Sequence, residues 1–233
     1  MNKIYNLIII DFETTGFNIK TNGIIQIGAY SYYYDKYFNQ LLNPEINKYE
    51  NNIFWNKKSE KVNKITKKMI VDKPLTREYL LEFVKEMIFD NELKIKLIPI
   101  FIAHNSSFDK RFFEKYINKK DINSILNKIN ETNKTDKIDI DNIIYNINKN
   151  NINSEIKNIE IKWFDTLKYF RKHNKFTTYK LKDIFDNIKN KNIITLTKNT
   201  NNNQFHDALF DVKILKYLIE YYNITKKYII EFE

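Results

Sequence analysis

The chain of 233 residues is predicted to fold as an α/β sandwich around one mixed sheet of five strands. Three apolar strand patterns lie within the first 42 residues and are joined by short polar turns, which is typical of an antiparallel meander. Further along, segments with helical spacing alternate with two more strand patterns, which indicates strands connected through helices. The length and the 42% of hydrophobic residues favour a single domain over residues 1–233.

The predicted strands share continuous apolar or aromatic runs, and they cover residues 7–13, 24–33, 36–42, 97–103 and 161–166. Apolar residues at helical spacing predict helices at 59–70, 75–89, 106–116, 166–172, 178–188 and 207–222. Thr76 and the pair Ser106-Ser107 are predicted N-caps of two of these helices. His104 and Asn105 are expected to hold the loop before the second of them. Residues 118–160 are rich in Asn, Lys and Ile and are predicted to be an insertion, helical around 140–147.

Two carboxylates end the first predicted strand, where Leu7 to Ile10 is followed by Asp11 and Glu13. Side chains two apart on a strand project from the same face, so both acids point one way, with Cα atoms about 6.6 Å apart. Phe12 is expected to point to the opposite face. Two converging acids favour a hard cation, although an isolated pair at a strand end would also serve solubility.

Two further acids and one histidine occur later in the chain. Asp109 falls in the first turn of the helix that follows strand 97–103, and it approaches Asp11 if the two strands are neighbours. His206 and Asp211 are five residues apart, which is a rotation of about 140° on a continuous helix. They converge only if His206 belongs to the loop before the helix, and the polar residues 201–204 favour that placement.

Four carboxylates in one cleft repel one another, and without cations some of them would take up protons. Two Mg²⁺ or Mn²⁺ ions would balance the four negative charges and prefer such oxygen ligands. Two ions about 3.5–4 Å apart suit an in-line phosphoryl displacement. His206, titrating near pH 6.5 if unperturbed, would take the proton from the attacking water.

The ordered elements D-x-E-T-T-G from Asp11, H-N-x-x-F-D from His104 and H-x-x-x-x-D from His206 carry a family resemblance. The chain resembles the DEDDh branch of the DnaQ-like 3′–5′ exonuclease superfamily, which has a ribonuclease-H-like fold, and in particular the proofreading exonucleases of the polymerase III epsilon-subunit type. The resemblance runs from about Leu7 to Tyr222 and skips residues 118–160.

The resemblance implies a role for each acid. Asp11, Glu13 and Asp211 would bind the metal that positions the attacking water. Asp11 would bridge to a second ion that Asp109 also holds, and His206 would be the general base.

The resemblance also implies how a substrate would bind. Backbone around Thr14 would hold the terminal nucleotide, and Phe17 would press against its base. The products would be nucleoside 5′-monophosphates. One departure concerns the base pocket, because Asn63-Lys64-Ile65-Thr66 stands where family members often have His-Gly-Ile-Thr.

The net charge of +10 comes from 39 Lys and Arg against 29 Asp and Glu, which favours a polyanionic partner. A coding bias is the alternative, because Lys, Asn and Ile are frequent along the whole chain. The absence of Cys and of long apolar runs predicts a soluble intracellular protein, cytoplasmic or nuclear, without disulfides or membrane contact.

The sequence therefore predicts a metal-dependent 3′–5′ exonuclease that acts on single-stranded nucleic acid or a frayed 3′ end, with a slight preference for DNA. An exoribonuclease with the same site is the first alternative. A non-catalytic nucleic-acid-binding module is the second. A polymerase or a replication or repair complex is an expected partner.

Overall fold

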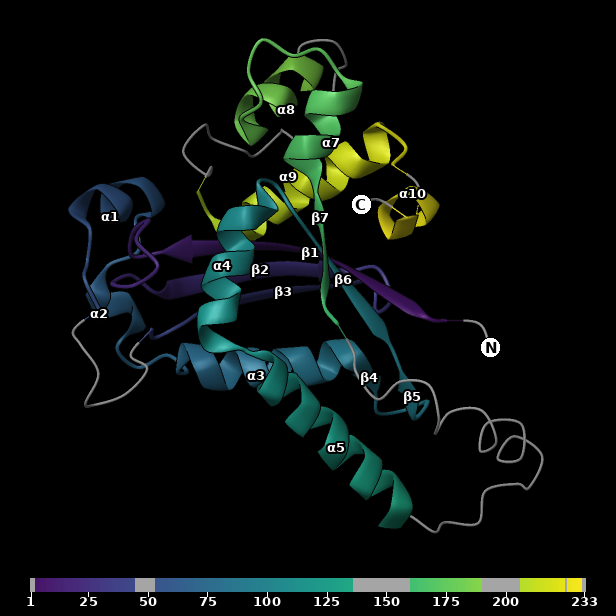
Figure 1. The fold of residues 1–233 in the computed structure, drawn as a ribbon. Coiled ribbons are helices and arrows are strands. Elements are labelled where there is room, and N and C mark those ends of the chain that lie inside the picture. The colour runs from purple at the N-terminus through teal and green to yellow at the C-terminus, as the bar shows by residue number, and fades with distance from the viewer. Residues whose placement is uncertain (1–2, 45–52, 136–159, 190–205, 225, 232–233) are drawn as a thin grey trace.

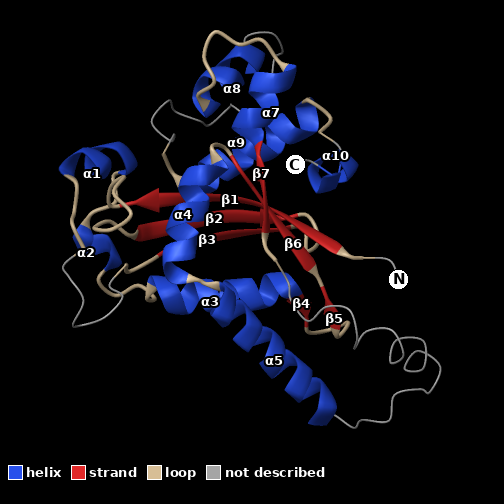
Figure 2. Ribbon diagram, in the orientation of Figure 1, coloured by secondary structure: helices blue, strands red, loops and turns tan. Residues whose placement is uncertain are grey.

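The computed structural model describes residues 3–44, 53–135, 160–189, 206–224 and 226–231. Five strands form one sheet, and helices cover both of its faces (Figure 1, Figure 2). The predicted mixed five-stranded sheet flanked by helices is confirmed.

The sheet has the strand order β3-β2-β1-β6-β7. An antiparallel meander is formed by β1 (Tyr5–Thr14), β2 (Ile24–Ser31) and β3 (Lys36–Leu41). On the other side of β1, β6 (Ile98–Ala103) and then β7 (Lys162–Asp165) pair in parallel. The carboxyl ends of β1, β6 and β7 therefore meet at one edge of the sheet, which we call the carboxyl edge.

The residues of β1 alternate between two hydrophobic cores. Ile8 and Phe12 belong to the core on one face, whereas Leu7 and Ile9 belong to the core on the other. Because side chains alternate along a strand, the two acids of β1 share the face of Leu7 and Ile9. The predicted opposite orientation of Phe12 is confirmed.

Each core is closed by its own group of helices (Figure 1). The face of Ile8 and Phe12 packs against α3 (Thr76–Ile88), α4 (Ser106–Tyr116) and α5 (Lys119–Thr135). The other face packs against α7 (Thr166–His173), α8 (Leu181–Lys189), α9 (Ala208–Tyr221) and α10 (Lys226–Glu231).

Three shorter pieces complete the described fold. Helices α1 (Lys57–Asn63) and α2 (Lys67–Ile70) lie beyond the carboxyl end of β1 (Figure 1). A small hairpin pairs β4 (Phe89–Asp90) with β5 (Ile95–Lys96). Within the part of the chain that the structure describes, no helix is long and apolar enough to cross a membrane.

The single helix predicted at 59–70 is wrong, because the chain forms α1 and α2 instead. Lys64 ends α1 in the left-handed conformation, with φ 62°, and donates its backbone N–H to the carbonyl of Glu60. A helix cannot continue through a left-handed residue, so a new one begins after Thr66.

The two predicted N-caps are also wrong. Leu75 is the N-cap of α3, and the Thr76 hydroxyl instead hydrogen-bonds to the carbonyls of Ile24 and Asn43, at 2.9 Å in each case. Asn105 is the N-cap of α4, with φ 67°, a left-handed conformation that Asn tolerates better than most residues.

The segment predicted as an insertion begins with helix α5. Its residues Ile122, Leu126 and Ile129 are buried in the core that also contains α3 and α4. Their spacing of four and three places them on one helical face. The helix predicted around residues 140–147 lies outside the described residues.

Candidate metal and catalytic site

The acids of β1 lie where the strand reaches the carboxyl edge. Asp11 is opposite Gly28 and Glu13 is opposite Gln26 in the pairing with β2, and the register shifts directly after Glu13. Both acids are half-buried. The shift ends regular pairing, so the acids stand at the end of the strand and face α9.

The amino end of α9 packs directly on β2. A Cβ at Gly28 would lie 2.3 Å from the carbonyl carbon of Ala208, so only glycine permits this approach. Asp207 caps the helix by accepting a hydrogen bond from the N–H of Phe210 at 3.0 Å. Gln26, which is buried, donates from Nε2 to Asp207 at 3.2 Å and accepts from the N–H of Ala208 at 3.3 Å.

This docking brings the later acid and the histidine to β1. His206 precedes the helix with φ 69°, and Asp211 lies in the first turn of α9. Ligand atoms of Glu13, His206 and Asp211 all lie within 4.8 Å of one another. The prediction that His206 belongs to the loop before the helix is confirmed, and that placement lets it converge with Asp211.

Asp109 reaches the same edge from the opposite face of the sheet. It lies on α4, is only 3% exposed, and its Oδ1 accepts a hydrogen bond from the backbone N–H of Phe12 at 3.2 Å. The Asp11 carboxylate is close enough to raise the pKa of Asp109, after the larger effect of burial. The Asp11 charge also raises the pKa values of Glu13 and Asp211, so Asp11 interacts with the acids on both faces of the sheet, although neither Asp11 nor Asp109 belongs to the tight group of Glu13, His206 and Asp211.

Burial and mutual repulsion raise the pKa values of Asp11, Glu13, Asp109 and Asp211. Burial, followed by the charge of Asp207, raises the pKa of Asp11 to about 7. Burial and then the Asp11 carboxylate raise the pKa of Glu13 to about 9 and that of Asp211 to about 8. Near neutral pH and without cations, the cluster therefore retains protons that bound cations would displace.

The donor set fits a hard divalent cation. Asp211 Oδ1 is buried and has no hydrogen-bond partner among the described residues, so one ligand atom is left uncompensated. The neighbouring donors are carboxylate oxygens and one imidazole, which suit Mg²⁺ or Mn²⁺.

The histidines of the second and third motifs, His104 and His206, differ in their surroundings. Partial burial lowers the pKa of His206, although the residue as a whole is exposed, so its imidazole is neutral near pH 7 and can accept a proton. The ring of His104 instead bonds the carbonyl of Tyr179 at 2.7 Å and the hydroxyl of Thr166 at 3.1 Å. These bonds fit the structural role expected for His104.

The residues predicted to meet the substrate lie just beyond Glu13. Thr14 is buried and donates its hydroxyl to the carbonyl of Gly16 at 2.8 Å, so its backbone is the part left for a ligand. The ring of Phe17 is 78% exposed and lies edge-on to Phe108, with centroids 6.1 Å apart.

Three residues of the site were missed by the sequence analysis. Asp207 adds a fifth carboxylate, Gln26 holds the start of α9, and Asn63 donates from Nδ2 to the carbonyl of Thr14 at 3.2 Å. A hydrogen bond from Asn63 also lowers the pKa of Glu13, against the larger effect of burial. Of these three residues, only Asn63 was noted in the sequence, because it stands where family members often have a histidine.

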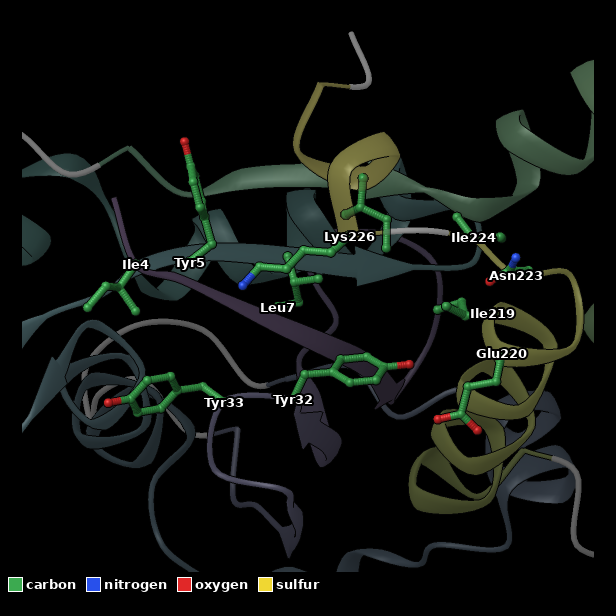
Figure 3. Close-up of a pocket in the computed structure, with 11 residues that line it drawn as sticks. Ile4, Tyr5, Leu7, Tyr32, Tyr33, Ile219, Glu220, Asn223, Ile224 and Lys226 are labelled. Atoms are coloured by element: carbon green, nitrogen blue, oxygen red, sulfur yellow. The ribbon is translucent and has the colours of Figure 1, made fainter. Parts of the chain in front are cut away.

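One pocket of the described residues lies away from these acids. It has a volume of about 570 Å³, and its lining includes Tyr5, Leu7 and Tyr32 (Figure 3). Leu7 precedes Asp11 by four residues on β1, which is about 13 Å along the strand. The pocket therefore contains none of the clustered acids.

A cluster of acids with a loop histidine at the edge of a mixed sheet suits metal-assisted hydrolysis of phosphodiesters. The chain belongs to the RNase_T exonuclease family, whose model matches residues 8–130. The resemblance to the DnaQ-like superfamily is thereby confirmed, and the chain is a 3′–5′ exonuclease by class. Membership implies dependence on divalent metal ions. No curated protein sequence matches the chain.

Solved exonuclease structures share the fold. Exonuclease X in complex with 5′ overhanging duplex DNA is 17% identical, with 96% of each chain covered and a TM-score of 0.50. The zinc-bound E. coli exonuclease I complex with single-stranded DNA is 11% identical, with a TM-score of 0.56, 99% of this chain covered and 43% of that one. Exonuclease I from Methylocaldum szegediense is 12% identical, with a TM-score of 0.55, 98% of this chain covered and 42% of that one. The chain thus spans nearly all of exonuclease X and about two fifths of exonuclease I.

Proposed function

We propose that the protein removes nucleoside 5′-monophosphates from the 3′ end of nucleic acid with two divalent ions, Mg²⁺ or Mn²⁺. The observation that carries the proposal is the convergence of Glu13, His206 and Asp211 within 4.8 Å. Asp11 lies beside them, and Asp109 is bonded to the backbone between Asp11 and Glu13. A module that only binds nucleic acid would gain nothing from gathering mutually repelling acids.

The proposed roles of the acids are those that the family resemblance implies, and the positions of the acids support them. Asp11, Glu13 and Asp211 would hold one ion, and Asp11 with Asp109 would hold the other. Bound ions would stabilise the charge that develops on the attacking and leaving oxygens of the phosphodiester. The uncompensated Oδ1 of Asp211 supports its role as a ligand.

His206 would act as the general base. Its neutral imidazole would take the proton of the attacking water. His206 itself has a left-handed backbone conformation and lies before α9, so its backbone is not part of the hydrogen bonding of that helix. Thr14 would hold the terminal nucleotide through its backbone. Phe17 would stack on the terminal base, because its ring is exposed beside the acids of β1.

DNA is the proposed substrate in preference to RNA. Structures that share the fold hold a 5′ overhanging duplex in exonuclease X and single-stranded DNA in exonuclease I. A single strand or a frayed 3′ end suits a site at the edge of a sheet. No comparison points to a polymerase as a partner.

We also propose that residues 1–233 act as one exonuclease domain. The first strand and α9 contribute to the same acid cluster, and α5 shares a core with α3 and α4. The site therefore depends on segments from both ends of the described chain.

The test is hydrolysis of labelled DNA and RNA oligomers of the same sequence, each with Mg²⁺, Mn²⁺ or a chelator. We expect release of 5′-monophosphates from the 3′ end, faster from DNA, with no release in the chelator. Asp11→Ala serves as the inactive control. Binding of oligomers without any release by the wild type would leave only the non-catalytic module, and faster release from RNA would favour the exoribonuclease.

A further inference from the structure

The positive charge of the chain is concentrated in two segments. The first basic segment, residues 57–68, has six lysines and one glutamate, and the second basic segment, residues 166–182, has five lysines, one arginine and no acid. The net charges of the two segments add up to slightly more than the +10 of the whole chain, so the rest of the chain is close to neutral. A coding bias alone would spread the charge evenly, and this distribution therefore calls for a structural reason.

The first basic segment is bonded at both ends of α1 to the backbone that follows Glu13. Asn56, at the start of α1, donates its N–H to the carbonyl of Thr15 at 2.9 Å. Asn63, at the end of α1, donates from its side chain to the carbonyl of Thr14 at 3.2 Å. The exposed lysines of α1 are thereby fixed next to the acids of β1.

The second basic segment is bonded in the same way to the loop before α4, the helix that carries Asp109. The ring of His104 bonds Thr166, at the start of the segment, and the carbonyl of Tyr179, near its end. Ser106 also donates its hydroxyl to Asp165 at 3.2 Å. This segment is therefore fixed at the carboxyl ends of β6 and β7.

The two segments stand on different sides of the carboxyl edge, with α1 and α2 beyond the tip of β1 and α7 beyond the tips of β6 and β7 (Figure 1). We propose that they hold the phosphates of one nucleic-acid strand on either side of the acid cluster, so that its 3′ end reaches the site. This inference rests on the proposed function, and it names the surface that binds the rest of the strand.

Several lysines on these segments are available for phosphate. Lys57, Lys58 and Lys61 are exposed and form no salt bridge within the described ranges. Lys168, Lys175 and Lys180 are likewise exposed and outside every ion pair of the described residues. Lysines that neutralise phosphates release counterions, which drives binding of any sequence.

An exposed aromatic ring precedes the first basic segment. Phe54 is 58% exposed, and its N–H donates to the carbonyl of Thr21 at 2.8 Å. Its position relative to the first basic segment is therefore fixed by the loop that follows β1. Bases of a single strand stack on such rings, whereas the paired bases of a duplex are not free to do so.

Three matched triple variants test the inference. The first changes Lys57, Lys58 and Lys61 to Gln, and the second changes Lys168, Lys175 and Lys180 to Gln. The control changes Lys94, Lys120 and Lys162 to Gln, which are equally exposed but lie outside both segments. The melting temperature of each variant checks that the fold is retained.

Binding is measured by fluorescence anisotropy with a labelled DNA single strand of about 20 nucleotides, in chelator, over a range of salt concentrations. Each segment variant should lose on the order of 10- to 100-fold in affinity near 0.1 M salt, and the slope of log affinity against log salt should fall by about 2. The control should keep the affinity and slope of the wild type. Segment variants that bind the single strand as tightly as the control would overturn the inference. It would also be overturned if the wild type bound a blunt duplex more tightly than the single strand and the segment variants lost the same affinity for that duplex.

Cleavage of a dinucleotide separates this inference from the proposed function, because so short a substrate does not extend beyond the acid cluster. With Mg²⁺, the segment variants should cleave the dinucleotide at the rate of the wild type. If the segment variants also cleave the dinucleotide more slowly, the lysines maintain the acid cluster itself. That result would refute the inference that the two basic segments bind the rest of the strand. A wild type that binds the long strand but cleaves neither substrate would refute the proposed function and leave the binding result standing.

Discussion

Gly28 lies directly beneath Ala208, and a methyl group at Gly28 would stand 2.3 Å from the Ala208 carbonyl carbon. This contact joins the middle of β2 to the first turn of α9, the helix that carries Asp211. Any side chain at Gly28 must therefore push the helix away from the acids of β1.

Gly28→Ala should reduce both stability and activity. Overpacking of this kind costs about 1–3 kcal/mol, and displacement of α9 separates Asp211 and His206 from Glu13. We expect a lower melting temperature and a loss of hydrolysis on the order of 10-fold or more, measured on a labelled DNA oligomer. Unchanged activity in a folded variant would mean that α9 need not approach β2 so closely.

The stability of the metal-free protein should depend on pH. The pKa values of Asp11, Asp211 and Glu13 are raised to about 7, 8 and 9, from ordinary values of 3.8 for Asp and 4.5 for Glu. Acids with raised pKa stabilise the fold when protonated, so this contribution is complete below about pH 4 and is lost as pH rises through 7 to 9. In chelator, the melting temperature should fall between pH 6 and pH 9.

Two controls isolate the acid cluster as the cause. Mg²⁺ should restore the melting temperature at pH 9, because cations replace the lost protons. Asp211→Asn should reduce the pH dependence in chelator and abolish hydrolysis. A pH profile that is identical with and without Mg²⁺ would contradict the prediction.

His206→Ala should lower kcat without unfolding the protein. A general base contributes about 10²- to 10⁴-fold, and an exposed loop residue contributes little to packing. Because burial lowers the pKa of His206, the wild type should retain full kcat down to pH values below 6.5. Steady-state kinetics over a pH series give both results.

His104→Ala is the contrasting variant. It removes hydrogen bonds to Thr166 and Tyr179, so it should lower the melting temperature instead of acting on the proton transfer alone. A His206→Ala variant with wild-type kcat would exclude His206 as the base.

Asn63→Ala should raise the concentration of Mg²⁺ needed for half-maximal activity. A hydrogen bond from Asn63 lowers the pKa of Glu13, so its loss lets protons compete more strongly with the metal. A Mg²⁺ titration at pH 7.5 measures the effect, which should shrink at pH 9, where Glu13 is more fully ionised. An equal midpoint in variant and wild type would show that Asn63 serves only to hold Thr14.

The features that depend on local sequence could be predicted well. The alternation of β1 placed Asp11 and Glu13 on one face because a strand has a period of two. His206 could be assigned to a loop because a continuous helix would have turned it away from Asp211. The strands and most helices followed from apolar spacing within each segment.

The motifs predicted that the acids and His206 would meet, but other contacts between distant segments could not be predicted. Gln26 accepts a hydrogen bond from Ala208 at the start of α9, 182 residues further along the chain, and no local sequence pattern predicts such a bond. The Thr76 hydroxyl donates a hydrogen bond to the Ile24 carbonyl of β2 and does not cap its own helix. A residue type that is typical of an N-cap therefore gave a wrong prediction here. Lys64 adopts a left-handed conformation that its residue type disfavours, which is why the break between α1 and α2 had no sequence signal.

The separation of β1 and α9 along the chain also affects when the enzyme becomes active. Translation proceeds from the amino end, and Asp211 leaves the ribosome about 200 residues after Asp11. A nascent chain that has already folded β1, β2 and β3 still lacks Asp109, His206 and Asp211. On the proposed roles of His206 and Asp211, we expect the unfinished polypeptide to be unable to degrade nucleic acid until α9 has emerged and docked.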